Sequence, residues 1–206
     1  MIVVSIHLQY MGVTVTQNPS WEKHISIITS KANSTRAFLH RNLKGCSRKI
    51  KSRCYLSLVR PRLEYSSSIW DPHQAKYVQK LEMVQRRAAR SVMNDYSRKS
   101  SVTAMMSKLK WDSLQSRRQD NKVTLLYKLV NGLVEAPDCK TSLRTTSVKT
   151  RGHQTKLFVP RSSTDAHRFS FIPSAIRLWN DLPASVASAA DLTSFKNGLQ
   201  QTHSCQ

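Results

Sequence analysis

Basic side chains are the residues of this chain whose number and spacing point most clearly to a chemistry. No acidic residue interrupts the sequence between Glu22 and Glu64, and a second basic stretch begins near Lys80. Charge of one sign on neighbouring helices is repulsive, and a bound phosphate backbone relieves that repulsion. We therefore expect a polyanion-binding surface, the alternative being a merely solvated one. The first stretch includes Arg36, Arg41, Lys44, Arg48, Lys49, Lys51, Arg53, Arg60 and Arg62, and the second includes Lys80, Arg86, Arg87 and Arg90.

The overall composition also favours a polyanionic partner. The 206 residues include 33 Lys and Arg but only 12 Asp and Glu, which gives a formal net charge of +21. Lys and Arg displace the counterions of nucleic acid, so RNA, DNA or an RNA–DNA hybrid is the expected partner, bound with low sequence specificity. Anionic lipid is the lesser competitor. The expected phosphate contacts are Arg48, Lys49, Arg53, Arg60, Arg62, Lys80, Arg86, Arg87 and Arg90.

Catalytic chemistry finds little support in the sequence. Enzymes that act on nucleic acids commonly hold two metal ions between clustered carboxylates, whereas the carboxylates here are separated along the chain. The histidines have no Ser, Cys or Asp at a suggestive spacing, and the isolated glycines form no phosphate-binding loop. The four cysteines show no zinc or disulfide spacing, which favours reduced thiols. We therefore expect no catalytic residue, no metal site and no cofactor.

Aromatic residues lie near the basic stretches in the sequence. The rings of Tyr55, Tyr65, Trp70, Tyr77 and Tyr96 could stack on bases or sugars. Packing in the core is the preferred interpretation for the tryptophans. These are Trp21, Trp70, Trp111 and Trp179.

The sequence also limits where the chain is expected to act. The first residues do not read as a signal peptide, because a basic start is missing and His7 and Gln9 interrupt the apolar residues. No stretch approaches the roughly 20 apolar residues of a membrane-spanning helix. We expect a nuclear or cytoplasmic protein that is neither secreted nor inserted in a membrane.

The elements that must position the basic residues are mostly amphipathic helices. Alternation of apolar and polar residues over 1–16 predicts one or two short strands. Apolar residues over 21–43 recur at steps of three and four, which predicts a helix with Ser20 as its N-cap and Gly45 as its stop. A second helix is expected to begin at Ser47 and to kink or end at Pro61. Its expected inner face consists of Ile50, Cys54 and Leu58.

Three further helices complete the expected bundle. The clearest pattern starts near Ala75, with basic residues outward and Leu81, Val84, Ala88 and Val92 inward. Ser101 is expected to cap a short helix, and a longer one runs from about Ser113 to Gly132. Helices packed in this way form a bundle core.

The carboxyl-terminal part is expected to be smaller and less regular. Residues 156–160 and 169–172 could form brief strands, and Pro173 is expected to open a helix. A last helix, capped by Asp191, would dock through Leu192, Phe195 and Leu199. The fold class is therefore mainly α, with a short amino-terminal β element. The expected segments are 1–16 for the strands, 17–132 for the bundle, 133–154 for a linker or loop and 155–206 for the small helical region.

Several motifs in order resemble the carboxyl-terminal part of reverse transcriptases from non-LTR retrotransposons, especially the jockey-like elements. Each motif is weak alone, but their order spans nearly the whole chain. They are Y-M-G-V at 10–13, similar to the Y-L-G-V of that family; W-E-K-H-I at 21–25; V-R-P-R-L-E-Y at 59–65; W-D-P at 70–72; L-E-M-V-Q-R-R-A-A-R at 81–90; Y-K-L-V-N-G at 127–132; R-G-H at 151–153; and S-F-I-P-S-A-I-R-L-W-N-D-L-P at 170–183.

The resemblance implies that the bundle corresponds to the polymerase thumb, which grips the template–primer duplex, and that 1–16 is an edge of the palm sheet. In this family the aspartates that bind Mg²⁺ lie in palm motifs that would precede Met1. Met11 stands where the family usually has Leu, and Ile172 where Phe is common. The expectation is a truncated RNA-directed DNA polymerase, without enzymatic activity, that keeps its affinity for nucleic acid.

Two alternatives stay open at this point. The chain could be part of a longer active reverse transcriptase, or act with a palm supplied in trans; upstream coding sequence with paired aspartates would indicate this. It could instead be a protein-interaction module retained by a host, in which an unpaired strand over 2–6 joins a partner.

Overall fold

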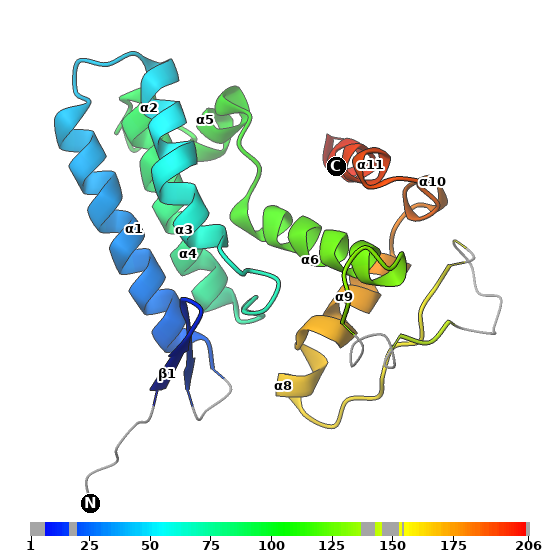
Figure 1. Cartoon of the computed structure of the whole chain (residues 1–206). Helices are drawn as coiled ribbons and strands as arrows, with labels where there is room; N and C mark the ends of the chain where they lie inside the picture. The colour runs from blue at the N-terminus through cyan, green and yellow to red at the C-terminus, as the bar shows by residue number, and fades with distance from the viewer. Residues whose placement is uncertain (1–6, 17–19, 137–142, 146–152, 154, 205–206) are drawn as a thin grey trace, which may run out of the picture. The chain divides into compact units, whose positions relative to one another are not determined.

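The computed structural model describes residues 7–16, 20–136, 143–145, 153 and 155–204 of the chain (Figure 1). Most of the chain is helical and a two-stranded sheet lies near the amino terminus, which confirms the expected mainly α fold with a short β element. The chain divides into two compact units, Met1–Arg117 and Arg118–Gln206, and this division falls inside the segment 17–132. Within the described ranges, no helix has the length and apolar character needed to cross a membrane.

The two strands form a hairpin. β1 (His7–Tyr10) pairs antiparallel with β2 (Val13–Thr16), so that Leu8 lies opposite Val15. The turn residues Met11 and Gly12 have φ of 45° and 80°, the left-handed conformation that a two-residue hairpin turn requires. Both strands lie where the alternation predicts them. The remaining predicted strand residues, 2–6, lie outside the described part of the chain.

Two long helices form the centre of the first unit. α1 (Glu22–Asn42) packs against α4 (Ala75–Met93), and each lies where the apolar periodicity predicts a helix. The buried residues of α1 are His24, Ile25, Thr29 and Ala32, so small and polar side chains of α1 share the core with the apolar face of α4. The α4 residues predicted to face inward, Leu81, Val84, Ala88 and Val92, are all buried.

The ends of α1 differ from the prediction by a few residues. Trp21 rather than Ser20 occupies the N-cap position, although Ser20 Oγ accepts a hydrogen bond from Glu22 N at 3.3 Å. Leu43 is the C-cap, so the helix ends before Gly45 is reached. Cap positions are set by local backbone angles, and a polar residue next to a helix start can bond to it from either of two positions.

Three consecutive elements form one continuous helical stretch over 48–64. α2 (Arg48–Cys54) is capped by Ser47, as predicted, because Ser47 Oγ accepts from Ile50 N at 3.4 Å. A π-helical turn, η1 (Tyr55–Val59), follows and leads into α3 (Arg60–Glu64). Pro61 lies in the first turn of α3 and has no N–H to donate to the helical turn before it. The irregular turn before it is the structural response to the proline.

The predicted inner face of this stretch is wrong. Ile50 and Leu58 are 48% and 50% exposed, respectively. The buried residues are instead Tyr55, Val59 and Leu63. These residues are also four apart, so they form a neighbouring face of the same stretch, and η1 and α3 pack against α1.

The first unit is completed by a short helix and the start of a longer one. Ser101 caps α5 (Val102–Leu109), as predicted, with Oγ accepting from Ala104 N at 3.3 Å. α5 packs against α4. The division between the units falls within α6 (Leu114–Val130). Trp70 and Trp111 are buried in the core of this unit, as expected, while Trp21 is only partly buried.

The second unit has its own aromatic core. The ring of Phe195 stacks on Tyr127 with centroids 4.3 Å apart and lies 5.9 Å from that of Trp179. The Trp179 carbonyl oxygen is 2.9 Å from His153 Nε2, and its indole N–H donates to the Thr155 carbonyl at 2.8 Å. The predicted core position of Trp179 is therefore confirmed.

The strands predicted for the second unit are not formed. Phe171 and Ile172 belong to α9 (Phe171–Asn180), because a short apolar run fits a helix as well as a strand and Ser170 supplies the N-cap position. Over 156–160 the structure has a single isolated bridge, between Leu157 and Thr145. The other helices described here are α8 (Asp165–Arg168), α10 (Ala184–Ala187) and α11 (Leu192–Ser204), the last capped by Asp191 as predicted.

Candidate nucleic-acid interface

Most of the expected phosphate-binding side chains are exposed and make no hydrogen bond or ion pair to another described residue. They lie on α2, α3 and α4, which belong to one compact unit. A cationic side chain whose donors are not used within the protein can offer all of them to a phosphate. The exposed side chains without a hydrogen bond or ion pair to another described residue are Arg48, Lys49, Arg53, Arg62, Arg86 and Arg87.

Cations from α1 and α4 come together along their shared border. Lys80 Nζ donates to Ser26 Oγ of α1 at 3.2 Å. One face of α4 carries both Lys80 and Arg87, because they are seven residues apart. Arg87 also lies close enough to Arg36 of α1 to act on its titration: burial lowers the pKa of the Arg36 guanidinium, and the positive charge of Arg87 lowers it further.

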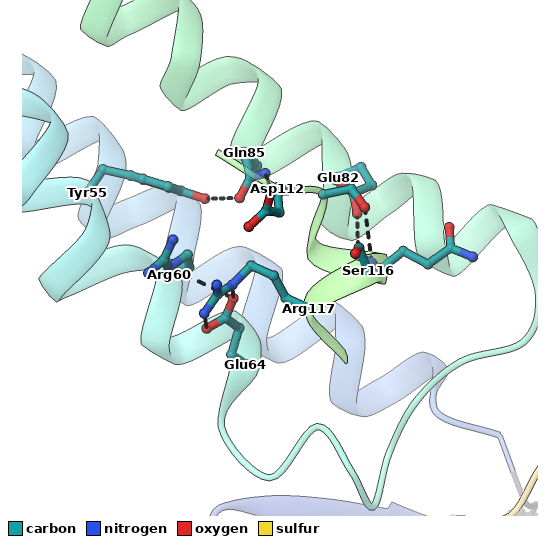
Figure 2. A network of polar contacts seen from close by, with 10 residues as sticks. Tyr55, Arg60, Glu64, Glu82, Gln85, Asp112, Ser116 and Arg117 are labelled. Carbon is teal, nitrogen blue, oxygen red and sulfur yellow. Dashed lines mark hydrogen bonds and ion pairs between the residues drawn. The ribbon is translucent and has the colours of Figure 1, made fainter. Parts of the chain in front are cut away.

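Arg60 is engaged within the protein. Its Nε lies 3.8 Å from Glu64 Oε1, and Arg117 binds the same carboxylate through both Nε and Nη2, the latter at 3.2 Å (Figure 2). Burial lowers the pKa of the Arg60 guanidinium, and the nearby Arg117 lowers it as well. Two guanidinium groups thus share one carboxylate, which leaves the cluster with a net positive charge.

Arg90 also has protein partners. Its guanidinium donates to the carbonyl oxygens of Ser97 at 2.9 Å and of Asp95 and Ser100 at 3.4 Å each. These bonds hold the loop that follows α4, which begins at the left-handed residue Asn94. Arg90 therefore has fewer donors left for a ligand than Arg86 on the same helix.

A buried polar chain links η1, α4 and the segment before α6. The Tyr55 hydroxyl donates to Gln85 Oε1 at 3.0 Å, and Gln85 Nε2 donates to the Asp112 carbonyl at 2.7 Å (Figure 2). Burial raises the pKa of the Tyr55 phenol far above its usual range. Nearby, Gln115 N donates to Glu82 Oε1 at 2.8 Å and fixes the start of α6.

The aromatic residues considered for base stacking divide into two groups. Tyr55, Trp70 and Tyr77 are buried and present no free ring face to a ligand. Tyr65 and Tyr96 are 57% and 55% exposed, respectively, so only these two stay candidates for stacking.

The described residues include no group of three His, Cys, Asp or Glu that could hold a metal ion. Glu64 and Glu82, two carboxylates of the first unit, receive hydrogen bonds from Arg117 and from the Gln115 backbone. Glu64 is therefore engaged in ion pairing and Glu82 in capping the start of α6.

One feature of this region carries no sequence signal. A small pocket that opens to solvent lies between α1, α2, η1 and α4, and Arg36, His40, Lys51 and Ser91 are among its lining residues. Arg36 and Lys51 belong to the basic stretch. The sequence does not show that Lys51, 15 residues after Arg36, and Ser91, a further 40 residues on, line the same pocket as Arg36. The pocket follows from the way in which three helices cross.

No protein-family model, curated protein or solved structure matches this chain. The similarity of its motifs to those of non-LTR reverse transcriptases therefore stays an expectation from the sequence.

Proposed function

We propose that this protein binds the sugar–phosphate backbone of nucleic acid with little sequence preference, through the exposed basic side chains of α2, α3 and α4. One observation carries the proposal: six exposed Arg and Lys side chains of this unit make no hydrogen bond or ion pair to another described residue. Structural cations commonly pair with a carboxylate or cap a carbonyl, as Arg60 and Arg90 do here. The six others have no such role.

The net charge of +21 supports the same proposal. Each Lys or Arg that neutralises a phosphate releases condensed counterions, so the affinity is expected to fall steeply with salt. Guanidinium groups form paired hydrogen bonds with phosphate oxygens, and arginine predominates among the six. The resemblance to a polymerase thumb fits this role, with RNA, DNA and RNA–DNA hybrid as the ligands to compare.

The test is a salt titration of binding with two charge-matched variants. The first replaces Arg48, Arg53 and Arg86 by Gln, and the second replaces Arg144, Arg161 and Lys196, which are exposed in the other unit, by Gln. Both lose the same charge. Fluorescence anisotropy with single-stranded RNA, duplex DNA and a hybrid of one sequence gives the slope of log affinity against log salt.

The first variant is expected to have a slope shallower by roughly three, or about one for each lost phosphate contact, and a weaker affinity for all three ligands. The second is expected to stay close to the wild type. Equal losses in both variants would mean that binding depends on net charge alone and would refute the assignment to α2, α3 and α4. Absence of binding at physiological salt would refute the function itself.

A further inference from the structure

The pocket between α1, α2, η1 and α4 combines an apolar wall with cationic side chains. Leu39 of α1, its C-cap Leu43 and Val59 of η1 contribute to the wall. Arg36 and Lys51 bring positive charge to the same pocket, and the described residues that line it include no carboxylate. An apolar surround reduces the screening of charge, so an anion that enters would be attracted more strongly than at an open surface.

Arg36 is the residue that points to a ligand. Its side chain is partly buried, and its Nε is enclosed with no hydrogen-bond partner among the described residues. Apart from burial, the largest influence on the pKa of Arg36 is another cation, Arg87, which lowers it. A desolvated donor with no acceptor is unfavourable, and a second positive charge nearby adds to the penalty. An anion in the pocket would offset the repulsion between Arg36 and Arg87.

Two further groups can complete an anion site. His40 Nδ1 and Ser91 Oγ lie 2.9 Å apart on the facing sides of α1 and α4, and both line the pocket. The bond between them uses the hydrogen of one group, and the other group can still donate a hydrogen bond to an anion oxygen. Lys51 Nζ donates to the Lys44 carbonyl at 3.1 Å, which leaves it two more donors.

We infer that this pocket binds the terminal phosphate monoester of a nucleic-acid strand. A terminal phosphate carries close to two negative charges at neutral pH and is substituted on one side only, so it can enter a pocket that a continuous backbone passes over. The inference rests on the proposed function, since it places one end of the bound strand. It also makes a separate claim, because the exposed cations of α2, α3 and α4 do not distinguish a strand end from its interior.

The test compares one short single-stranded oligonucleotide in three forms: with a 5′-phosphate, with a 3′-phosphate and with no terminal phosphate. The unmodified 206-residue chain is expected to bind one of the phosphorylated forms about tenfold more tightly than the unphosphorylated form. In Arg36→Met this preference should vanish while binding of the unphosphorylated form persists. Arg41→Gln, an exposed change of equal charge on α1, should lower all three affinities equally and keep the preference.

The possible outcomes separate this inference from the proposed function. Equal binding of the three forms by the wild type, or a preference that survives in Arg36→Met, would overturn the phosphate pocket and leave backbone binding intact. Inorganic phosphate, added as a probe to the isotopically labelled protein, should shift the amide resonances around Arg36 and Ser91. Binding of inorganic phosphate without any preference among the oligonucleotides would also overturn the inference, because the site would then serve a free ion.

Discussion

The Tyr55 hydroxyl donates a hydrogen bond to Gln85 Oε1, 3.0 Å away, and both side chains are almost completely buried. Gln85 Nε2 in turn donates a hydrogen bond to the Asp112 carbonyl. The Tyr55 ring stacks on Trp111 with centroids 4.4 Å apart. These hydrogen bonds and the stacked rings connect η1 and α4 to the segment before α6. The Tyr55 hydroxyl and both polar atoms of the Gln85 side chain thus have hydrogen-bond partners, so their burial does not destabilise the fold.

Loss of the Tyr55 hydroxyl should destabilise the first unit. Tyr55→Phe leaves Gln85 Oε1 buried without its donor, and we expect a loss of about 1–3 kcal/mol in the free energy of unfolding. Tyr65→Phe, at an exposed position, should change it by less than about 0.5 kcal/mol. Urea unfolding followed by tryptophan fluorescence measures both. Similar values for the two variants would mean that the buried hydrogen bond contributes nothing.

Loss of the Glu64 carboxylate, which Arg60 and Arg117 share, should lower the free energy of unfolding more than loss of Arg60. Glu64→Gln removes the carboxylate that two partly buried guanidinium groups share, and we expect about 1–3 kcal/mol of destabilisation. Arg60→Met should have a smaller effect, because Arg117 still pairs with Glu64. Chemical denaturation of both variants gives the comparison. The opposite order would show that Arg60 is the principal partner.

Stability of the first unit should depend on the protonation of His24. The ring is buried, its Nδ1 accepts from Thr14 N at 3.2 Å, and burial lowers the pKa of His24 below the ordinary value of 6.5. The unfolded chain therefore binds the proton more readily than the folded one. The stabilisation is complete above pH 6.5 and is lost as the pH falls from 6.5 toward the lower pKa of the folded state.

This dependence can be measured as the free energy of unfolding at several pH values. In the wild type, His24 should contribute a slope of at most about 1.4 kcal/mol per pH unit below pH 6.5. In His24→Gln this contribution should disappear. His167→Gln, which changes an exposed histidine, should keep the wild-type profile. A profile of His24→Gln that stays parallel to that of the wild type would exclude His24 as the source.

Arg86 and Arg90, four residues apart on α4, should differ in what their loss affects. Arg90→Met removes the donors to three loop carbonyls and should destabilise the protein by about 1–3 kcal/mol. Arg86→Met should leave stability within about 0.5 kcal/mol but make the salt dependence of nucleic-acid binding shallower by about one. Denaturation and anisotropy on the same two proteins provide both measurements. A loss of stability in Arg86→Met, or a change of salt dependence confined to Arg90→Met, would contradict these assignments.

The long helices could be predicted from the sequence because their apolar residues repeat regularly. The inner positions of α4, from Leu81 to Val92, follow the helical period and are buried as predicted. Gln85 lies on the same buried face, but a polar residue there gives no periodic signal. Its partners Tyr55 and Asp112 are 30 and 27 residues away, and only the packing of the elements brings them together.

The candidate site shows the same division. The basic character of α2, α3 and α4 can be read from the sequence, since exposure is the usual state of Arg and Lys. The sequence does not reveal that Arg60 faces Glu64 and Arg117, or that Arg90 turns back to the loop after its own helix. The pocket at Arg36 and Ser91 depends on a helix crossing. Which cations are available to a ligand is thus a property of the tertiary structure.

The π turn Tyr55–Val59 has a consequence for how this part of the chain tolerates change in length. A π turn contains one residue more than an α turn over the same rise, so the stretch 48–64 behaves as a helix that has absorbed a one-residue insertion. Deleting a single residue there would restore a uniform helix but rotate Leu63 by about 100° away from the core. The phase of α3 is therefore set by this extra residue, and the position of Glu64 depends on it as well.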